Sequence, residues 1–154
     1  MHLFLMQHAE ALPKQENLER PLTAEGRGNA AAVAAMCGKL GLAVHQIQHS
    51  GKTRAEQTAR IVAEALSPPG SVVQVDGLGP RDEVEPVAAR LIDNAEPVML
   101  VGHLPFLERL AACLLTGDPE RTIIQFTNAA IVCLVGEGDR WQVRWIITPE
   151  IAAL

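Results

Sequence analysis

Three separated segments constrain this chain most, because each places a side chain that can bind phosphate where a strand gives way to a helix. They are Leu3–His8, Ser50–Thr58 and Val98–His103. In an open α/β sheet, the carboxyl ends of the parallel strands form the ligand crevice. The sequence therefore predicts that two histidines and an arginine converge on one anion.

The order of the expected elements predicts an α/β fold. Strands are expected at Leu3–Met6, Val44–Gln48, Val72–Val75 and Val98–Val101, and apolar residues recur at helical spacing after each of them. Thr23 is expected to cap the first helix and Thr53 the second. Strand and helix alternate, which favours a mainly parallel sheet in a three-layer α/β/α architecture with right-handed crossovers.

The last third of the chain predicts an antiparallel hairpin at one edge of the sheet. Ala129–Val135 and Trp141–Ile147 are strand-like runs, and Gly136–Asp139 between them has the composition of a hairpin turn. By alternation, Trp141 and Trp145 are expected on one face, both in the core.

Length, charge and cysteine content narrow the class of protein. A chain of 154 residues with 48% hydrophobic residues is the size of one domain, so we expect residues 1–154 to form a single unit and a monomer. The net charge of −5 gives no general attraction for nucleic acid or an anionic membrane. The odd number of cysteines, without C-x-x-C spacing, indicates core residues in a reducing compartment, and we expect a cytoplasmic protein.

The residue types at the three segments are those that phosphoryl transfer requires. A neutral His8 can attack phosphorus, and Arg54, in the first turn of its helix, can bind phosphate with two donors. Ser50 and a protonated His103 can donate further hydrogen bonds. Each residue alone is more simply interpreted as structural; their combination carries the hypothesis.

The combination resembles the histidine phosphatase superfamily, with its phosphoglycerate mutase-like fold, and most closely the small SixA-type phosphohistidine phosphatases. The matching segments are Leu5–Ala9, Arg20–Thr23 with Gly26, Ser50 with Arg54–Ala59, Val101–Pro105 and Thr127–Ala130. The resemblance implies that His8 is the phosphorylated nucleophile and that Arg54 and His103 clamp the phosphate. It makes Arg20 a candidate for closing the pocket.

Two residues depart from the family's Arg-His-Gly motif. Gln7 replaces the arginine, and the loss of one charged donor could cost on the order of 3 kcal/mol, or roughly a hundredfold in rate. Gln7 still offers two N–H donors to a phosphate. Ala9 replaces the glycine, which is tolerated if its φ is negative, as we expect.

No side chain is clearly a general acid. Asp82 and Glu83 follow the third strand, where larger family members carry one, yet both could simply start the next helix. A missing acid favours phosphohistidine, whose leaving imidazole needs little help. We therefore expect a phosphatase that acts on protein phosphohistidine, without metal or other cofactor. The alternatives are a non-catalytic phosphate- or phosphohistidine-binding module and a phosphomonoesterase for small phosphate compounds.

Overall fold

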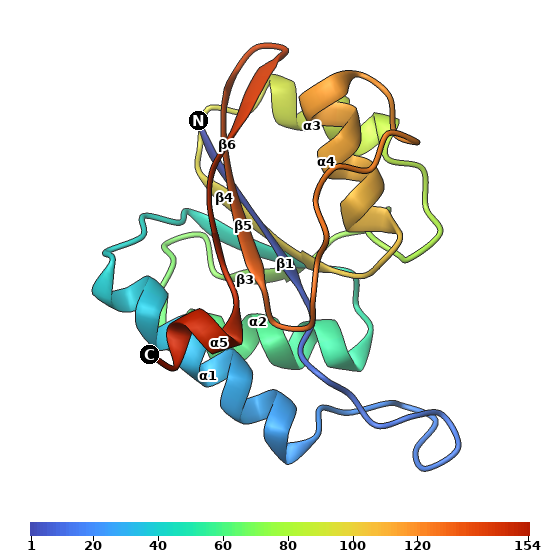
Figure 1. Ribbon diagram of the computed structural model, residues 1–154, viewed down its shortest axis with the longest axis vertical. Helices are drawn as coiled ribbons and strands as arrows, with labels where there is room; N and C mark the ends of the chain where they lie inside the picture. The colour runs from blue at the N-terminus through green and yellow to red at the C-terminus, as the bar shows by residue number, and fades with distance from the viewer.

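The computed structural model describes residues 1–154, which form six strands and five helices (Figure 1). The elements from β1 to α4 follow the predicted alternation of strand and helix, whereas the short C-terminal helix α5 was not predicted. The strands are β1 (His2–Gln7), β2 (Gln46–His49), β3 (Val72–Gln74), β4 (Val98–Gly102), β5 (Ile131–Glu137) and β6 (Arg140–Ile147). The helices are α1 (Ala24–Lys39), α2 (Thr53–Leu66), α3 (Glu85–Ile92), α4 (Phe106–Thr116) and α5 (Pro149–Ala152). The strand ends differ from the predicted ones by up to two residues. No helix combines the length and the apolar character that a membrane span requires.

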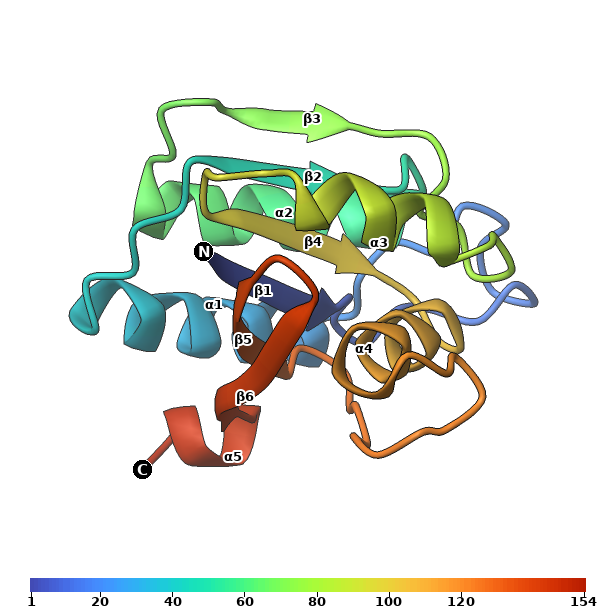
Figure 2. The ribbon, with the colours of Figure 1, turned by 90° about the horizontal axis from the view of Figure 1, so that it is seen from above.

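All six strands join one mixed sheet in the order β3-β2-β4-β1-β5-β6. The first four strands along the chain pair in parallel with one another. β5 pairs antiparallel with β1, and β5 and β6 form an antiparallel hairpin at one edge of the sheet, as predicted. Helices α1, α2 and α5 cover one face of the sheet, and α3 and α4 cover the other (Figure 2). The predicted three-layer α/β/α fold is confirmed.

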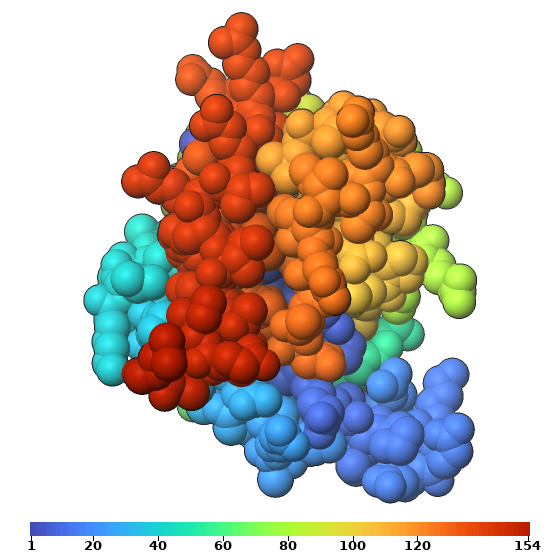
Figure 3. Space-filling view, viewed as in Figure 1, coloured from blue at the N-terminus to red at the C-terminus, as the bar shows by residue number.

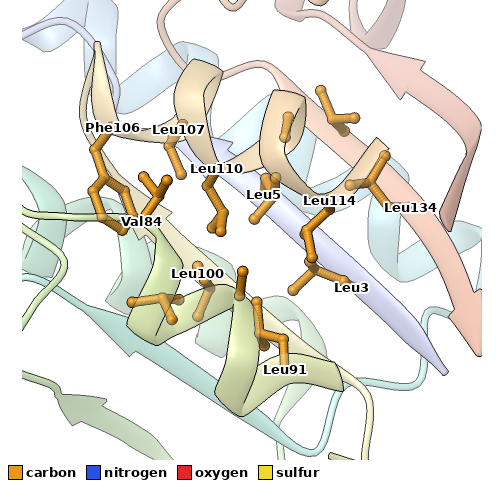
Figure 4. Packing of buried hydrophobic residues seen from close by; sticks show 14 of the residues in the cluster. Leu3, Leu5, Val84, Leu91, Leu100, Phe106, Leu107, Leu110, Leu114 and Leu134 are labelled. Atoms are coloured by element: carbon orange, nitrogen blue, oxygen red, sulfur yellow. The ribbon is translucent and has the colours of Figure 1, made fainter. Parts of the chain in front are cut away.

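Each face of the sheet has its own apolar core, and β1 contributes to both by alternation. Leu3 and Leu5 pack with α3 and α4, as Figure 4 shows, whereas Phe4 and Met6 pack with α1 and α2. This two-sided burial explains why the strand is a continuous apolar run. Burial of each of these large side chains contributes roughly 1.5–3 kcal/mol. The strand ends that carry the polar residues are therefore fixed by a packed core on both faces.

The helix caps agree with the sequence at α1 and differ at α2. Thr23 Oγ1 accepts a hydrogen bond from Gly26 N–H at 2.9 Å, and Gly41 has φ +66° just beyond the helix, as helix termination requires. Thr53 is the first residue of α2, not its cap. Lys52 occupies the cap position and makes no side-chain capping bond.

The two tryptophans lie on opposite faces of the sheet, so the prediction that they share one face was wrong. Trp141 packs into the α3–α4 core, and Trp145 contacts Phe4 on the other side. The register shifts where Cys133 pairs with Trp145 and Leu134 with Val143, which leaves one extra residue in β6. Such a bulge reverses the alternation of side chains beyond it.

Residues 9–23 form a loop that projects beside the carboxyl end of β1 (Figures 1 and 3). Ala11 pairs with Leu22 in an isolated antiparallel bridge, and Leu12 N–H donates to Pro21 O at 2.8 Å. Arg20 Nε donates to Leu12 O at 3.0 Å across the loop. These cross-links give the loop a defined shape at the rim of the sheet.

The base of this loop packs against α1 at Gly26, which yields a stability prediction. A Cβ at Gly26 would lie 2.2 Å from Glu10 O, so Gly26→Ala must displace backbone and should destabilise the protein by about 2 kcal/mol or more. Gly28 lies in the same helix with nothing within 4 Å of an added Cβ. Gly28→Ala should therefore stabilise by about 0.5–1 kcal/mol. Urea denaturation measures both, and equal effects at the two positions would contradict the packing.

Candidate active site

His8 is fixed by the end of β1 and by its neighbour β4. Gln7 pairs with Gly102 across these parallel strands, and His8 N–H donates to Gly102 O at 3.0 Å. The His8 ring is 8% exposed, and its Nδ1 lies 2.7 Å from Ala9 O. Because a carbonyl oxygen only accepts, Nδ1 carries the hydrogen, and the neutral ring keeps its lone pair on Nε2.

His103 follows β4 and lies next to His8. The two ring centroids are 5.2 Å apart with an interplanar angle of 51°. His103 Nε2 lies 2.6 Å from Ser50 Oγ, at the turn after β2. His49 supports that turn, because its Nδ1 accepts a hydrogen bond from Gly51 N–H at 3.1 Å. The pairing of β2 and β1 with β4 thus brings all three segments together.

Arg54 approaches from the first turn of α2. Its Nε donates to His8 Nε2 at 3.3 Å, so the guanidinium lies against the nitrogen that holds the lone pair. Arg20 lies close enough for its charge to lower the pKa of Arg54, after the larger effect of burial. Arg20 also has φ +50°, in the left-handed region that non-glycine residues occupy at a cost of about 1 kcal/mol or more. The structure thus gathers the side chains of five residues at the carboxyl ends of the parallel strands: His8, His103, Ser50, Arg54 and Arg20.

The site is electropositive, and both histidines are neutral. Burial lowers the pKa of His8 to about 4; the hydrogen bond to Ala9 opposes this shift, and the charges of Arg54 and Arg20 add to it. The pKa of His103 is lowered to about 3. Burial is the largest cause, and the charges of His8 and of the neighbouring cations lower the pKa further. His103 is therefore not protonated in the free protein at neutral pH, contrary to the state considered from sequence. A bound anion would oppose this shift at His103, whose protonated ring can donate to the anion.

Two buried polar atoms at these strand ends have no hydrogen-bond partner. They are Gln7 Oε1 and His103 Nδ1. Buried polar groups are almost always paired in folded proteins, so these two atoms are exceptions. A phosphate could accept from His103 Nδ1–H, but it would not pair with Gln7 Oε1, because an amide oxygen only accepts. Ala9 is fully buried and is not among the residues with positive φ, as expected, so the change from glycine causes no left-handed strain.

The two candidate acids do not join this cluster. Asp82 Oδ2 accepts from Gly79 N–H at 2.7 Å, and the Glu83 side chain is exposed. Neither forms a hydrogen bond or ion pair with His8, Arg54 or His103. No group of three metal-ligating side chains is present. A hollow of about 1000 Å³ lies at the other end of the strands, lined by Met1 and Trp141 among others, away from the histidines.

Two residues that sequence reasoning did not place among the site residues bind the backbone of His8 and Ala9. Thr58 Oγ1 accepts from Ala9 N–H at 3.0 Å, and Asn128 Nδ2 donates to His8 O at 3.0 Å. One signal was available for Thr58, a polar residue in the apolar face of α2 one turn after Arg54. Asn128 lies in the Thr127–Ala130 segment that resembles the family, but its bond to His8 has no local signal, because it depends on the pairing of β5 with β1.

The buried, neutral His8 predicts how stability depends on pH. A histidine in the unfolded chain takes up a proton near pH 6.5, whereas folded His8 does so near pH 4. Between these values the unfolded state binds more protons, so the free energy of unfolding falls as the pH falls, by up to about 3 kcal/mol from this group. Urea denaturation at pH 7, 6, 5 and 4 should show a shallower fall for His8→Gln than for the wild-type protein. Parallel pH profiles for His8→Gln and the wild-type protein would show that the pKa of His8 is not lowered in the folded state.

Comparisons with known proteins agree with this geometry. The model of the histidine phosphatase superfamily (branch 1) matches residues 3–83. Phosphohistidine phosphatase SixA of Escherichia coli (strain K12) is 28% identical over 155 aligned positions, covering 97% of this chain and 94% of the relative. The structure of the protein histidine phosphatase SixA complexed with tungstate is similar over 97% of both chains, with 28% identity and a TM-score of 0.86. A mycobacterial glucosyl-3-phosphoglycerate phosphatase complexed with VO3 shares the fold at 20% identity, with a TM-score of 0.71 over 94% of this chain and 98% of that one. The chain belongs to the histidine phosphatase superfamily.

Proposed function

We propose that this protein is a phosphohistidine phosphatase in which His8 accepts the phosphoryl group. The observation that carries the proposal is the state of His8: its Nδ1 hydrogen is engaged by Ala9 O, and its Nε2 lone pair lies beside Arg54 and near His103. This is the arrangement that a neutral imidazole nucleophile requires. The similarity to SixA supports the substrate class.

The chemistry proceeds in two displacements. His8 Nε2 forms a bond to phosphorus while the bond from phosphorus to the substrate's imidazole nitrogen breaks, and the departing imidazole takes a proton from water. Arg54, His103, Ser50 and Gln7 donate hydrogen bonds to the phosphoryl oxygens, with Arg20 at the rim. Water then attacks phosphorus, inorganic phosphate leaves, and neutral His8 is regenerated.

The lack of a carboxylate at the histidines favours this substrate over an alkyl phosphate. An alkoxide leaving group needs a proton from a positioned acid, whereas an imidazole can leave neutral or readily protonated. Asp82 and Glu83 form no hydrogen bond or ion pair with the site residues. The short chain also has few residues for a lid, so a protein surface could reach the site. A small-molecule phosphomonoesterase receives no support from the position of Glu83.

Replacement of His8 tests the proposal. The purified protein should dephosphorylate a phosphohistidine-carrying protein and, more slowly, an aryl phosphate, and His8→Ala should lower both rates by a factor on the order of 10³ or more. His45→Ala is the control: His45 is an exposed histidine just before β2, at the opposite end of that strand from Ser50, and its replacement should change neither rate. Quenching without acid should trap phosphate on His8. Equal rates for wild-type protein and His8→Ala would refute the proposal.

Gln7 yields a second prediction, because it stands where the family has an arginine. Gln7→Arg adds a permanent cation next to the transferring group and should raise kcat/KM for the aryl phosphate by up to about a hundredfold. Gln7→Met, of similar length but without donors, is the matched control and should not raise it. Steady-state kinetics measures both, and a decrease for Gln7→Arg in a folded protein would show that the pocket is adapted to a neutral residue.

The second candidate function is a non-catalytic phosphate- or phosphohistidine-binding module, which Gln7 and the missing acid favour. It predicts tungstate or phosphate binding that Arg54→Ala abolishes, with no turnover of any phosphorylated compound. Isothermal titration beside the rate measurements separates the two functions, because trapped phosphate on His8 is expected only from the enzyme.

A further inference from the structure

The peptide unit between His8 and Ala9 is held at both of its polar ends by residues from different parts of the fold. Its N–H, from Ala9, donates to Thr58 Oγ1 at 3.0 Å in α2. Its C=O, from His8, accepts from Asn128 Nδ2 at 3.0 Å and from Ala129 N–H at 3.3 Å, in the turn before β5. Two side chains and one amide therefore fix the plane of a single peptide bond.

Thr58 also connects this peptide to the residue that carries the guanidinium. Its hydroxyl donates to Arg54 O at 2.8 Å while it accepts from Ala9 N–H. Thr58 is fully buried, so water does not substitute for either bond. One hydroxyl thus links the backbone of Arg54 to the backbone next to His8, and fixes the approach of α2 to β1.

The orientation of this peptide matters because the next carbonyl selects the tautomer of His8. Neutral histidine can carry its hydrogen on either ring nitrogen, and only the form with hydrogen on Nδ1 has a lone pair on Nε2. Ala9 O, which accepts from Nδ1–H at 2.7 Å, belongs to the residue whose N–H is bound by Thr58. A rotation of the His8–Ala9 peptide would move that carbonyl away from the ring.

We propose that Thr58 and Asn128 are positioning residues that hold the His8–Ala9 peptide, so that Ala9 O fixes the Nδ1–H tautomer of His8 and Nε2 faces the phosphoryl group. The inference rests on the proposed function for its effect on turnover. Its structural part, the control of the tautomer, stands apart from any activity. Neither side chain has to touch the substrate for this role.

The test measures the tautomer of His8 directly, by imidazole ¹⁵N NMR of the free protein, with the His8 signals assigned by their loss in His8→Ala. The wild-type protein should show a single form with hydrogen on Nδ1. Thr58→Val, which keeps the shape and removes the hydroxyl, and Asn128→Ala should show a mixture of tautomers. Thr58→Ser, which keeps the hydroxyl, should restore the single form.

Kinetics supplies the second readout. Thr58→Val and Asn128→Ala should lower kcat by about 10- to 100-fold, as small displacements of a reacting group do. In Asn128→Ala the affinity for inorganic phosphate should change by less than about twofold, because Arg54 and its bond to Thr58 remain. Thr116→Val is the matched control for Thr58, since Thr116 makes the same bond to the carbonyl four residues earlier, at 2.8 Å, on α4. Gln125→Ala, at an exposed residue of the segment that precedes β5, is the control for Asn128. Both controls should keep the wild-type tautomer and rate.

The outcomes separate this inference from the proposed function. A single Nδ1–H tautomer in both Thr58→Val and Asn128→Ala would overturn it, whatever the activity. If the wild-type protein turned over no phosphorylated compound, the proposed function would fail, but the NMR comparison would still decide the role of the two residues. If Thr58→Val does not fold, the tautomer of His8 in Asn128→Ala decides the inference, because Asn128 is exposed and its replacement leaves the core unchanged.

Discussion

The parallel pairing of β1 with β4 is the constraint on which the candidate site depends. Their register places Gln7 opposite Gly102, so the residues that follow, His8 and His103, leave the sheet side by side. The register is fixed because both strands are buried on both faces, and a slip of one residue would turn each side chain to the opposite core. Two large apolar cores therefore determine the separation of two polar rings.

The electrostatics of the site follow from this burial. Both rings are neutral because burial penalises the imidazolium, and the nearby charges that act on them come from cations, chiefly Arg54 and Arg20. In the free protein Arg54 donates a hydrogen bond to His8, and Ser50 Oγ shares one with His103 Nε2. A phosphate would replace these bonds with charge-assisted ones, which are roughly twice as strong as neutral ones. The site is thus arranged for an anion without an internal carboxylate to compete for the cations.

Much of the fold could be predicted from the sequence, because the local signals agree with one another. Continuous apolar strands, the Thr23 cap and the Gly-rich hairpin turn each gave the correct element. The errors arose where a nonlocal interaction decided. The bulge in β6 separates Trp141 from Trp145, and Thr53 begins its helix without serving as the cap. Alternation and capping rules are local, and they carry no information on an inserted residue in a strand or on the path by which the chain enters a helix.

For the candidate site, the sequence by itself determined which residue types lie at the strand ends, and therefore that two histidines and an arginine meet at one edge of the sheet. Only the tertiary structure decided the protonation state of the rings, since burial sets it, and the tautomer of His8, since Ala9 O sets it. It also decided that Asn128, distant in the sequence, holds the backbone of His8 and that Glu83 does not join the cluster. The reason is physical: residue type and spacing fix local conformation, whereas burial and hydrogen-bond partners depend on segments that only the folded chain brings into contact.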